Sequence, residues 1–121
     1  MSKKILYVED SSINRMIVTR LASKDFEVEA VETAKECFEL AKKDFYDILL
    51  IDLNLDDPNI DGFGVLKQLK AYPNLEKSIF IAHTNYFGPE WEEKCMNAGF
   101  DIYYPKPFDI DKFEQLLKAK R

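Results

Sequence analysis

Acidic, hydroxyl and basic side chains follow four apolar segments of the chain. Glu9 and Asp10 come directly after the run ILYV, and Asp52 comes directly after ILLI. Thr84 ends the run IFIAHT, and Lys106 follows the stretch IYYP. Carboxylates grouped in this way can bind a cation, a hydroxyl can donate to an anion, and an ammonium can neutralise negative charge. This chemistry requires a fold that brings the four segments together.

The apolar pattern alternates between strands and helices along the chain. Strands are predicted in five segments, at residues 4–8, 26–32, 47–52, 78–84 and 101–108. Each is followed by a segment with apolar residues three and four positions apart, which is the spacing of an amphipathic helix. The first of these helices carries Ile13, Met16, Ile17 and Leu21 at that spacing. No linker interrupts the alternation, so we expect one domain.

Alternating strands and helices predict a parallel sheet covered on both faces, because right-handed crossovers return each helix over the sheet. Ligands of such sheets bind beyond the C-terminal ends of the strands. The five polar residues named above should therefore meet at one edge. Taken singly, Asp10 could be a helix cap, Thr84 could bond the local backbone and Lys106 could be a solvated surface charge. Their conjunction favours a site.

Three carboxylates at one place repel one another. Two like charges about 4 Å apart cost roughly 4 kcal/mol at an effective dielectric constant of about 20. Glu9, Asp10 and Asp52 should therefore destabilise the fold unless a cation lies among them. No histidine or cysteine is close to them in the sequence, and hard cations prefer oxygen ligands. We expect Mg²⁺ or Mn²⁺ at this site.

The composition excludes several classes of protein. The chain has 121 residues, of which 46% are hydrophobic, as in one ordinary globular domain. A net charge of −5 would repel a phosphate backbone, so we do not expect direct nucleic-acid binding. The apolar runs are far shorter than the roughly 20 residues of a membrane span. The N-terminal residues MSKK lead into ILYV without a signal-peptide pattern, so we expect a cytoplasmic protein that binds no membrane.

These motifs resemble the receiver domain of the two-component response regulators, over essentially the whole chain. VED at residues 8–10 is similar to the family's acidic pair, IDLNL to its phosphoacceptor segment, and DG at residues 61–62 to the turn before its third helix. IAHT is similar to its threonine-bearing strand end, and YYPKPF to its lysine-proline strand end. The resemblance implies one α/β domain over residues 1–121, a doubly wound (βα)5 flavodoxin-like fold whose five-stranded parallel sheet has the order 2-1-3-4-5.

The resemblance also implies which residues bind the metal ion and which one is modified. Asp52 would be phosphorylated. Asp10 and Asp52 would bind Mg²⁺ directly, together with the main-chain carbonyl of Asn54, and Glu9 would act on the ion through water. Physical chemistry agrees, because a carboxylate that attacks a phosphoryl group needs its own charge and that of the transferring oxygens neutralised.

The remaining residues of the resemblance imply a switch. Thr84 would donate to a phosphoryl oxygen, and Lys106 would pair with the phosphate or the carboxylate. Tyr103 matches the family's rotating aromatic residue, which would fill the space that Thr84 leaves. A plain edge-strand aromatic is the other interpretation of Tyr103. The resemblance implies a cis peptide bond between Lys106 and Pro107.

By this resemblance the chain is the phosphoacceptor of a two-component phosphorelay. It would take a phosphoryl group from a histidine kinase or a histidine phosphotransfer protein. It would then signal to a downstream protein partner or output domain through the surface of its fourth helix, fifth strand and fifth helix. It would catalyse only its own phosphorylation and dephosphorylation, so we do not expect an enzyme. The alternative is a receiver-like interaction module that is not phosphorylated. No output domain follows the final KAKR, so a free-standing regulator and a receiver cut from a larger protein are both possible.

The sequence departs from the family pattern next to the expected site. The stretch LDDPNI between Asp52 and Asp61 contains an insertion relative to the family. Tyr86 occupies a position that, in the family, borders the path of the water that attacks the phosphoryl group. We predict that Tyr86 and the acidic loop with Asp56 and Asp57 cover the phosphorylated aspartate and slow its hydrolysis. A solvated loop is the alternative, since loops tolerate insertions at low cost.

Overall fold

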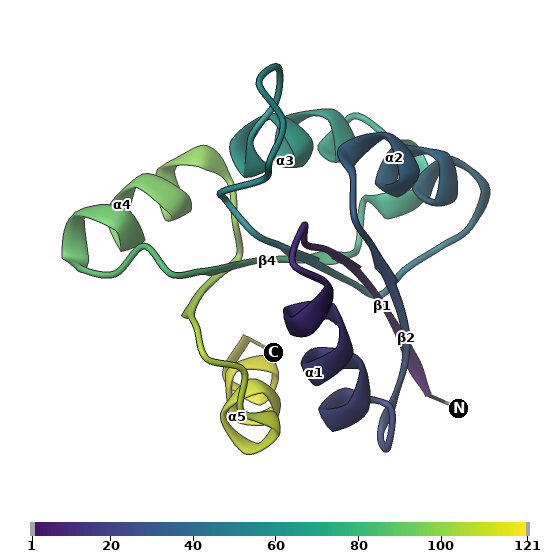
Figure 1. Ribbon diagram of the computed structural model, residues 1–121, viewed down its shortest axis with the longest axis vertical. Coiled ribbons are helices and arrows are strands. Elements are labelled where there is room, and N and C mark those ends of the chain that lie inside the picture. The colour runs from purple at the N-terminus through teal and green to yellow at the C-terminus, as the bar shows by residue number, and fades with distance from the viewer. Residues whose placement is uncertain (1, 121) are drawn as a thin grey trace.

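The computed structural model describes residues 2–120 and shows a five-stranded parallel sheet with helices on both faces (Figure 1). The strands are β1 (Lys3–Val8), β2 (Phe26–Val31), β3 (Ile48–Ile51), β4 (Ile79–Thr84) and β5 (Ile102–Pro105). The helices are α1 (Ser12–Ala22), α2 (Ala34–Lys43), α3 (Gly62–Lys70), α4 (Pro89–Ala98) and α5 (Ile110–Lys120), with a short 3-10 helix at Pro73–Leu75. The strand order β2-β1-β3-β4-β5 confirms the predicted fold class and order. Within residues 2–120, no helix has the length and apolar character needed to cross a bilayer.

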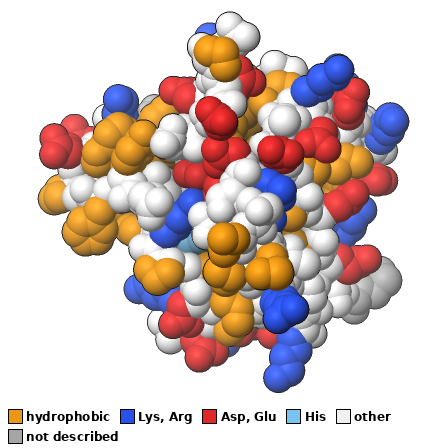
Figure 2. Space-filling view, viewed as in Figure 1, with side chains coloured by type: hydrophobic (Ala, Val, Ile, Leu, Met, Phe, Trp, Pro, Cys, Tyr) orange, Lys and Arg blue, Asp and Glu red, His pale blue; other side chains and the backbone are white. Residues whose placement is uncertain are grey.

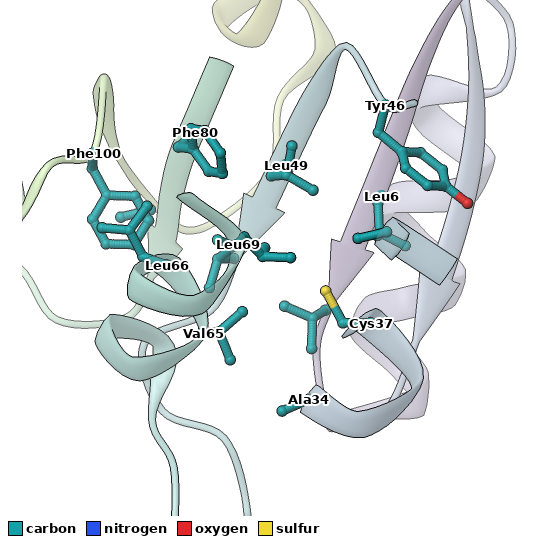
Figure 3. Packing of buried hydrophobic residues seen from close by; sticks show 14 of the residues in the cluster. Leu6, Ala34, Cys37, Tyr46, Leu49, Val65, Leu66, Leu69, Phe80 and Phe100 are labelled. Atoms are coloured by element: carbon teal, nitrogen blue, oxygen red, sulfur yellow. The ribbon is translucent and has the colours of Figure 1, made fainter. Parts of the chain in front are cut away.

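The sheet separates two hydrophobic layers. Successive residues of a strand point to opposite faces, so Leu49 lies in one layer, and Ile48 and Leu50 lie in the other. Helices α2, α3 and α4 cover the first face, and α1 and α5 cover the second. Figure 3 shows the first layer, in which Leu66 of α3 and Cys37 of α2 approach the strands. Because both faces are covered, β3 is apolar at every position.

Local signals begin and end the helices. Thr33 and Glu36 form a capping box at α2, in which the Thr33 hydroxyl accepts the Glu36 amide at 3.2 Å and the Glu36 carboxylate accepts the Thr33 amide at 3.3 Å. Asp61 caps α3 by accepting the amide of Gly64 at 3.0 Å. Gly99 ends α4 in a left-handed conformation, with φ of 114°. The helix boundaries are therefore encoded locally.

Helix α1 buries a different side from the one that its apolar spacing suggests. Val18 and Ala22 pack against the sheet. The four apolar residues at the predicted spacing are largely exposed, with exposed fractions of 63% for Ile13, 52% for Met16, 42% for Ile17 and 42% for Leu21. Figure 2 shows hydrophobic side chains gathered over α1. We call these four residues the α1 stripe.

Gly62 lies against the backbone that carries Asp52. A Cβ atom at Gly62 would lie 2.4 Å from the carbonyl oxygen of Asp52 and 2.6 Å from Cα of Leu53. Backbone atoms yield poorly, so we expect Gly62→Ala to lower the free energy of unfolding by about 2–4 kcal/mol. At Gly64 the added atom would meet Cγ1 of Ile60 at 2.7 Å. That side chain can rotate, so Gly64→Ala should cost less. Urea denaturation compares the two variants, and equal losses would contradict the prediction.

Candidate functional site

The C-terminal ends of four strands bring the predicted residues to one cavity. Glu9 and Asp10 follow β1, Asp52 follows β3, Thr84 ends β4, and Lys106 comes directly after β5. All five line a cavity of about 190 Å³. In Figure 2, acidic side chains gather from the projecting β3–α3 loop down to the middle of the visible face. The structure thus brings together the residues that the strand-end rule placed at one edge, and their chemical roles stay predictions.

Backbone hydrogen bonds hold these strand ends in register. The amide of Glu9 donates to the carbonyl of Val31 at 3.0 Å, that of Asp52 to Val8 at 3.2 Å, and that of Lys106 to Thr84 at 2.8 Å. The peptide bond between Lys106 and Pro107 is cis, as predicted. Each functional side chain therefore starts from a fixed point of the sheet rather than from a free loop.

Lys106 lies between two buried carboxylates. Its Nζ atom is 2.5 Å from Oε1 of Glu9 and 3.2 Å from Oδ2 of Asp52. Burial by itself would lower the pKa of Lys106, but the hydrogen bond from its ammonium to Glu9 and the negative charges of Asp52 and Glu9 raise it above its ordinary value. The ammonium therefore stays charged and stabilises both carboxylates.

Glu9 is held by donors that sequence reasoning missed. The hydroxyl of the buried Tyr7 donates to Oε1 at 2.9 Å, and the amide of Ser11 donates to Oε2 at 3.1 Å. Burial opposes ionisation of Glu9, but the hydrogen bonds from Lys106 and Ser11 hold its pKa below the ordinary value. The signal for Tyr7 was its position two residues before Glu9, because alternate residues of a strand share a side.

The pKa values of Asp10 and Asp52 show the effect of repulsion among the three carboxylates. Burial and the charge of Glu9 raise the pKa of Asp52 to about 6, and burial and Glu9 also raise the pKa of Asp10 above its ordinary value. One oxygen from each of the three acids lies within 4.8 Å of the others. Asn54 lines the same cavity, and its amide donates to Oδ1 of Asp52 at 3.3 Å. A cation would relieve this repulsion, so the cluster could hold a metal ion.

The two residues of the predicted switch both contact Tyr86. The hydroxyl of Thr84 accepts the amide of Tyr86 at 3.0 Å, and the hydroxyl of Tyr103 donates to the carbonyl of Tyr86 at 2.5 Å. Tyr86 also lines the cavity above Asp52, whereas the lining does not include the loop residues Asp56 and Asp57. We predicted that Tyr86 and the acidic loop would cover the phosphorylated aspartate. The structure places Tyr86 at the cavity, but not Asp56 or Asp57. Slow hydrolysis stays a prediction.

The raised pKa of Asp52 makes the stability of the metal-free protein depend on pH. The folded state holds the proton of Asp52 more tightly than the unfolded chain, whose carboxyl titrates near 3.8, so the contribution of this group to stability is greatest below that pH and is lost as pH rises through about 6. We expect Asp52→Asn to raise the free energy of unfolding by about 1–3 kcal/mol at pH 7, and to lose that advantage at pH about 4. Denaturation in the presence of a chelator measures both. Asp25→Asn, at an exposed turn, is the control, and a pH-independent effect of Asp52→Asn would contradict the prediction.

Comparison with known proteins agrees with this geometry. The sequence matches the response regulator receiver domain family over residues 5–118. It is 28% identical to the polar-differentiation response regulator DivK of Brucella ovis over 120 aligned residues. The alignment covers 98% of this chain and 96% of DivK. A CheY-like receiver domain from Methylobacillus flagellatus is 28% identical with a TM-score of 0.83, and 100% of each chain is covered. The receiver domain of the sensor histidine kinase PA1611 from Pseudomonas aeruginosa is 26% identical with a TM-score of 0.84, covers 98% of this chain and 97% of its own, and has a magnesium ion coordinated in its active-site cleft. The chain belongs to the response regulator receiver domain family.

Proposed function

We propose that this receiver accepts a phosphoryl group on Asp52 from a histidine kinase or a histidine phosphotransfer protein. The observation that carries the proposal is the position of the Asp52 carboxylate. It is bonded to the Lys106 ammonium through Oδ2 and lies beside Asp10 in the cavity. A carboxylate nucleophile that has a fixed ammonium beside it, and neighbouring acids that could hold a metal cation, suits transfer of an anionic group. The proposed exchange takes place in the cytoplasm.

The transfer forms one bond and breaks one. A carboxylate oxygen of Asp52 attacks phosphorus, and the bond from phosphorus to the donor nitrogen breaks, with the electron pair leaving on nitrogen. Lys106 stays charged and can follow the developing charge on the phosphoryl oxygens. Because the pKa of Asp52 is about 6, most of the carboxyl is ionised and nucleophilic at pH 7. The chain thereby acts only on itself and turns over no separate substrate.

The acidic cluster fits a divalent cation that prefers oxygen ligands. Following the family resemblance, we assign Asp10 and Asp52 as the direct ligands, together with the main-chain carbonyl of Asn54, and Glu9 as a residue that acts through water. The hydrogen bonds that both oxygens of Glu9 already accept are consistent with this indirect role. We assign Mg²⁺, with Mn²⁺ as the substitute, because it binds through one or two carboxylates and keeps several waters. When bound, the ion neutralises charge on the transferring oxygens.

We propose that Thr84 and Tyr103 transmit the structural change caused by phosphorylation from the site to the surface of the protein. An acyl phosphate adds charge and three acceptor oxygens, and the buried Thr84 hydroxyl is the donor placed to reach them from the end of β4. Tyr103 lies on β5 and lines a surface cavity whose other walls come from the start of α4 and from α5. A change at this surface would signal to a downstream protein partner.

The α1 stripe supports a protein as the phosphodonor. Ser11 and Asn14, at the start of helix α1, line the cavity. The exposed apolar side chains of the stripe therefore belong to a helix whose first turn reaches the site. Exposed apolar surface next to a site favours a protein partner. The net charge of −5 does not favour nucleic acid there.

Asp52 should gain one phosphoryl group when the protein is incubated with Mg²⁺ and acetyl phosphate, a small acyl phosphate. Intact mass spectrometry measures the added group. Asp52→Asn should gain none while remaining folded, because the nucleophile is gone. Asp25→Asn, at an exposed turn outside the cavity lining, should be modified like wild type. An unmodified wild-type protein would favour the alternative, an interaction module that is not phosphorylated.

Mg²⁺ should raise the melting temperature of the protein. An ion that binds only the folded cluster stabilises it by about 2.7 kcal/mol at a hundredfold excess over Kd. Asp10→Ala should abolish the ion effect, and it should raise the stability of the metal-free protein because it removes a repelling charge. Asp25→Ala removes the same charge at an exposed turn outside the cavity lining, and should keep the ion effect. A full Mg²⁺ response in Asp10→Ala would exclude Asp10 from the metal site.

A further inference from the structure

The β4–α4 loop makes three contacts through one residue, Tyr86. Its amide donates to the hydroxyl of Thr84 at 3.0 Å, and its carbonyl accepts the hydroxyl of Tyr103 at 2.5 Å. Its ring stacks on Trp91 of α4, with 4.4 Å between ring centroids and 21° between ring planes. The main chain of Tyr86 therefore contacts both residues of the predicted switch, while its side chain contacts a helix.

The contact continues beyond Trp91. The Nζ atom of Lys94 lies 4.9 Å from the ring centroid of Trp91 and 5.6 Å from that of Phe63. Phe63 belongs to the first turn of α3, next to Gly62, which lies against the backbone of Asp52. Rings and an ammonium thus connect the β4–α4 loop, α4 and the start of α3, which neighbour one another in Figure 1.

Thr84 cannot move toward Asp52 without affecting Tyr86. The threonine hydroxyl has one hydrogen and two lone pairs, and one lone pair accepts the Tyr86 amide. If Oγ1 moves toward a phosphoryl group, it either draws the amide of Tyr86 along or breaks that hydrogen bond. In the first case the stacked ring pulls on Trp91, and in the second case the loop is released from the site. The first outcome moves the stacked ring against α4, and the second frees the loop to change its contact with α4.

We propose that Tyr86 is a positioning residue that couples Thr84 to α4 through its stack on Trp91. The coupling rests on the proposed function, since Thr84 moves only when Asp52 carries a phosphoryl group. Among residues 2–120, no hydrogen bond joins the side chains of Thr84 and Tyr103 directly, whereas both are bonded to Tyr86. The shared partner of the two predicted switch residues is thus a residue that also holds α4.

Trp91 reports on this stack by its fluorescence, because it is the only tryptophan in the sequence. Emission is excited where tyrosine does not absorb, with Mg²⁺ present, before and after addition of acetyl phosphate. Intact mass spectrometry of the same samples gives the phosphorylated fraction. Dividing the change in emission by this fraction allows variants with different extents of phosphorylation to be compared. In wild type we expect phosphorylation to change the Trp91 emission. In Tyr86→Leu the emission of the unmodified protein should already be shifted, and phosphorylation should no longer change it. Tyr86→Phe retains a ring that can stack and should restore the response.

Phe87→Leu is the matched control. Phe87 is the next residue, 79% of it is exposed, and its ring pairs with no aromatic ring within residues 2–120, so this variant should respond like wild type. A wild-type response in Tyr86→Leu would overturn the coupling, as would an unchanged emission in wild type that carries the phosphoryl mass. Both results leave the proposed function standing. Absence of added mass in wild type would overturn the proposed function and the coupling with it.

Discussion

The burial of negative charge at one edge of the sheet is the constraint on which the structure depends. Glu9 and Asp52 are both buried, and the Lys106 ammonium is bonded to each. A carboxylate removed from water is costly unless cations or hydrogen-bond donors compensate it. Lys106 comes from the far side of β4 relative to these acids, because the strand order places β4 between β3 and β5. The end of β5 must therefore be positioned accurately for the acids of β1 and β3 to be tolerated.

The parallel sheet meets this requirement through its backbone. The amides of Glu9, Asp52 and Lys106 each donate to a neighbouring strand, one residue beyond the end of their own strand. The backbone entropy at these points is already lost when the sheet forms, so bringing the side chains together costs only their own rotamer freedom. The close approach of Gly62 to the carbonyl of Asp52 fixes the strand end from the α3 side as well. A long connecting loop, such as the acidic β3–α3 loop, can then be accommodated without displacing Asp52.

Two surface features lie outside this arrangement of charges and strand ends. The α1 stripe exposes apolar side chains on a helix whose first turn lines the cavity, and the β3–α3 loop projects from the same edge in Figure 1. Neither is required to hold the acids or Lys106. Receivers that share one chemistry must still be distinguished by their partners, and surfaces that adjoin the site without forming it can supply that distinction. The stack of Tyr86 on Trp91 is likewise not needed to hold the acids or Lys106. It connects Thr84 at the site to helix α4, and neither ring takes part in the proposed phosphoryl transfer.

The sequence by itself determined the alternation of strands and helices, the parallel sheet, and the meeting of the acids with Thr84 and Lys106. These features follow from local periodicity and from the rule that parallel strands end at a common edge, while the strand order and the cis bond came from the family resemblance. Only the tertiary structure decided that Tyr7 and Lys106 hold Glu9, that the α1 stripe faces outward, and that Tyr86 stacks on Trp91. Periodicity reports which residues share a side of a helix or strand. Which side is buried, and which partner each side chain meets, depends on packing between segments that are far apart in the sequence.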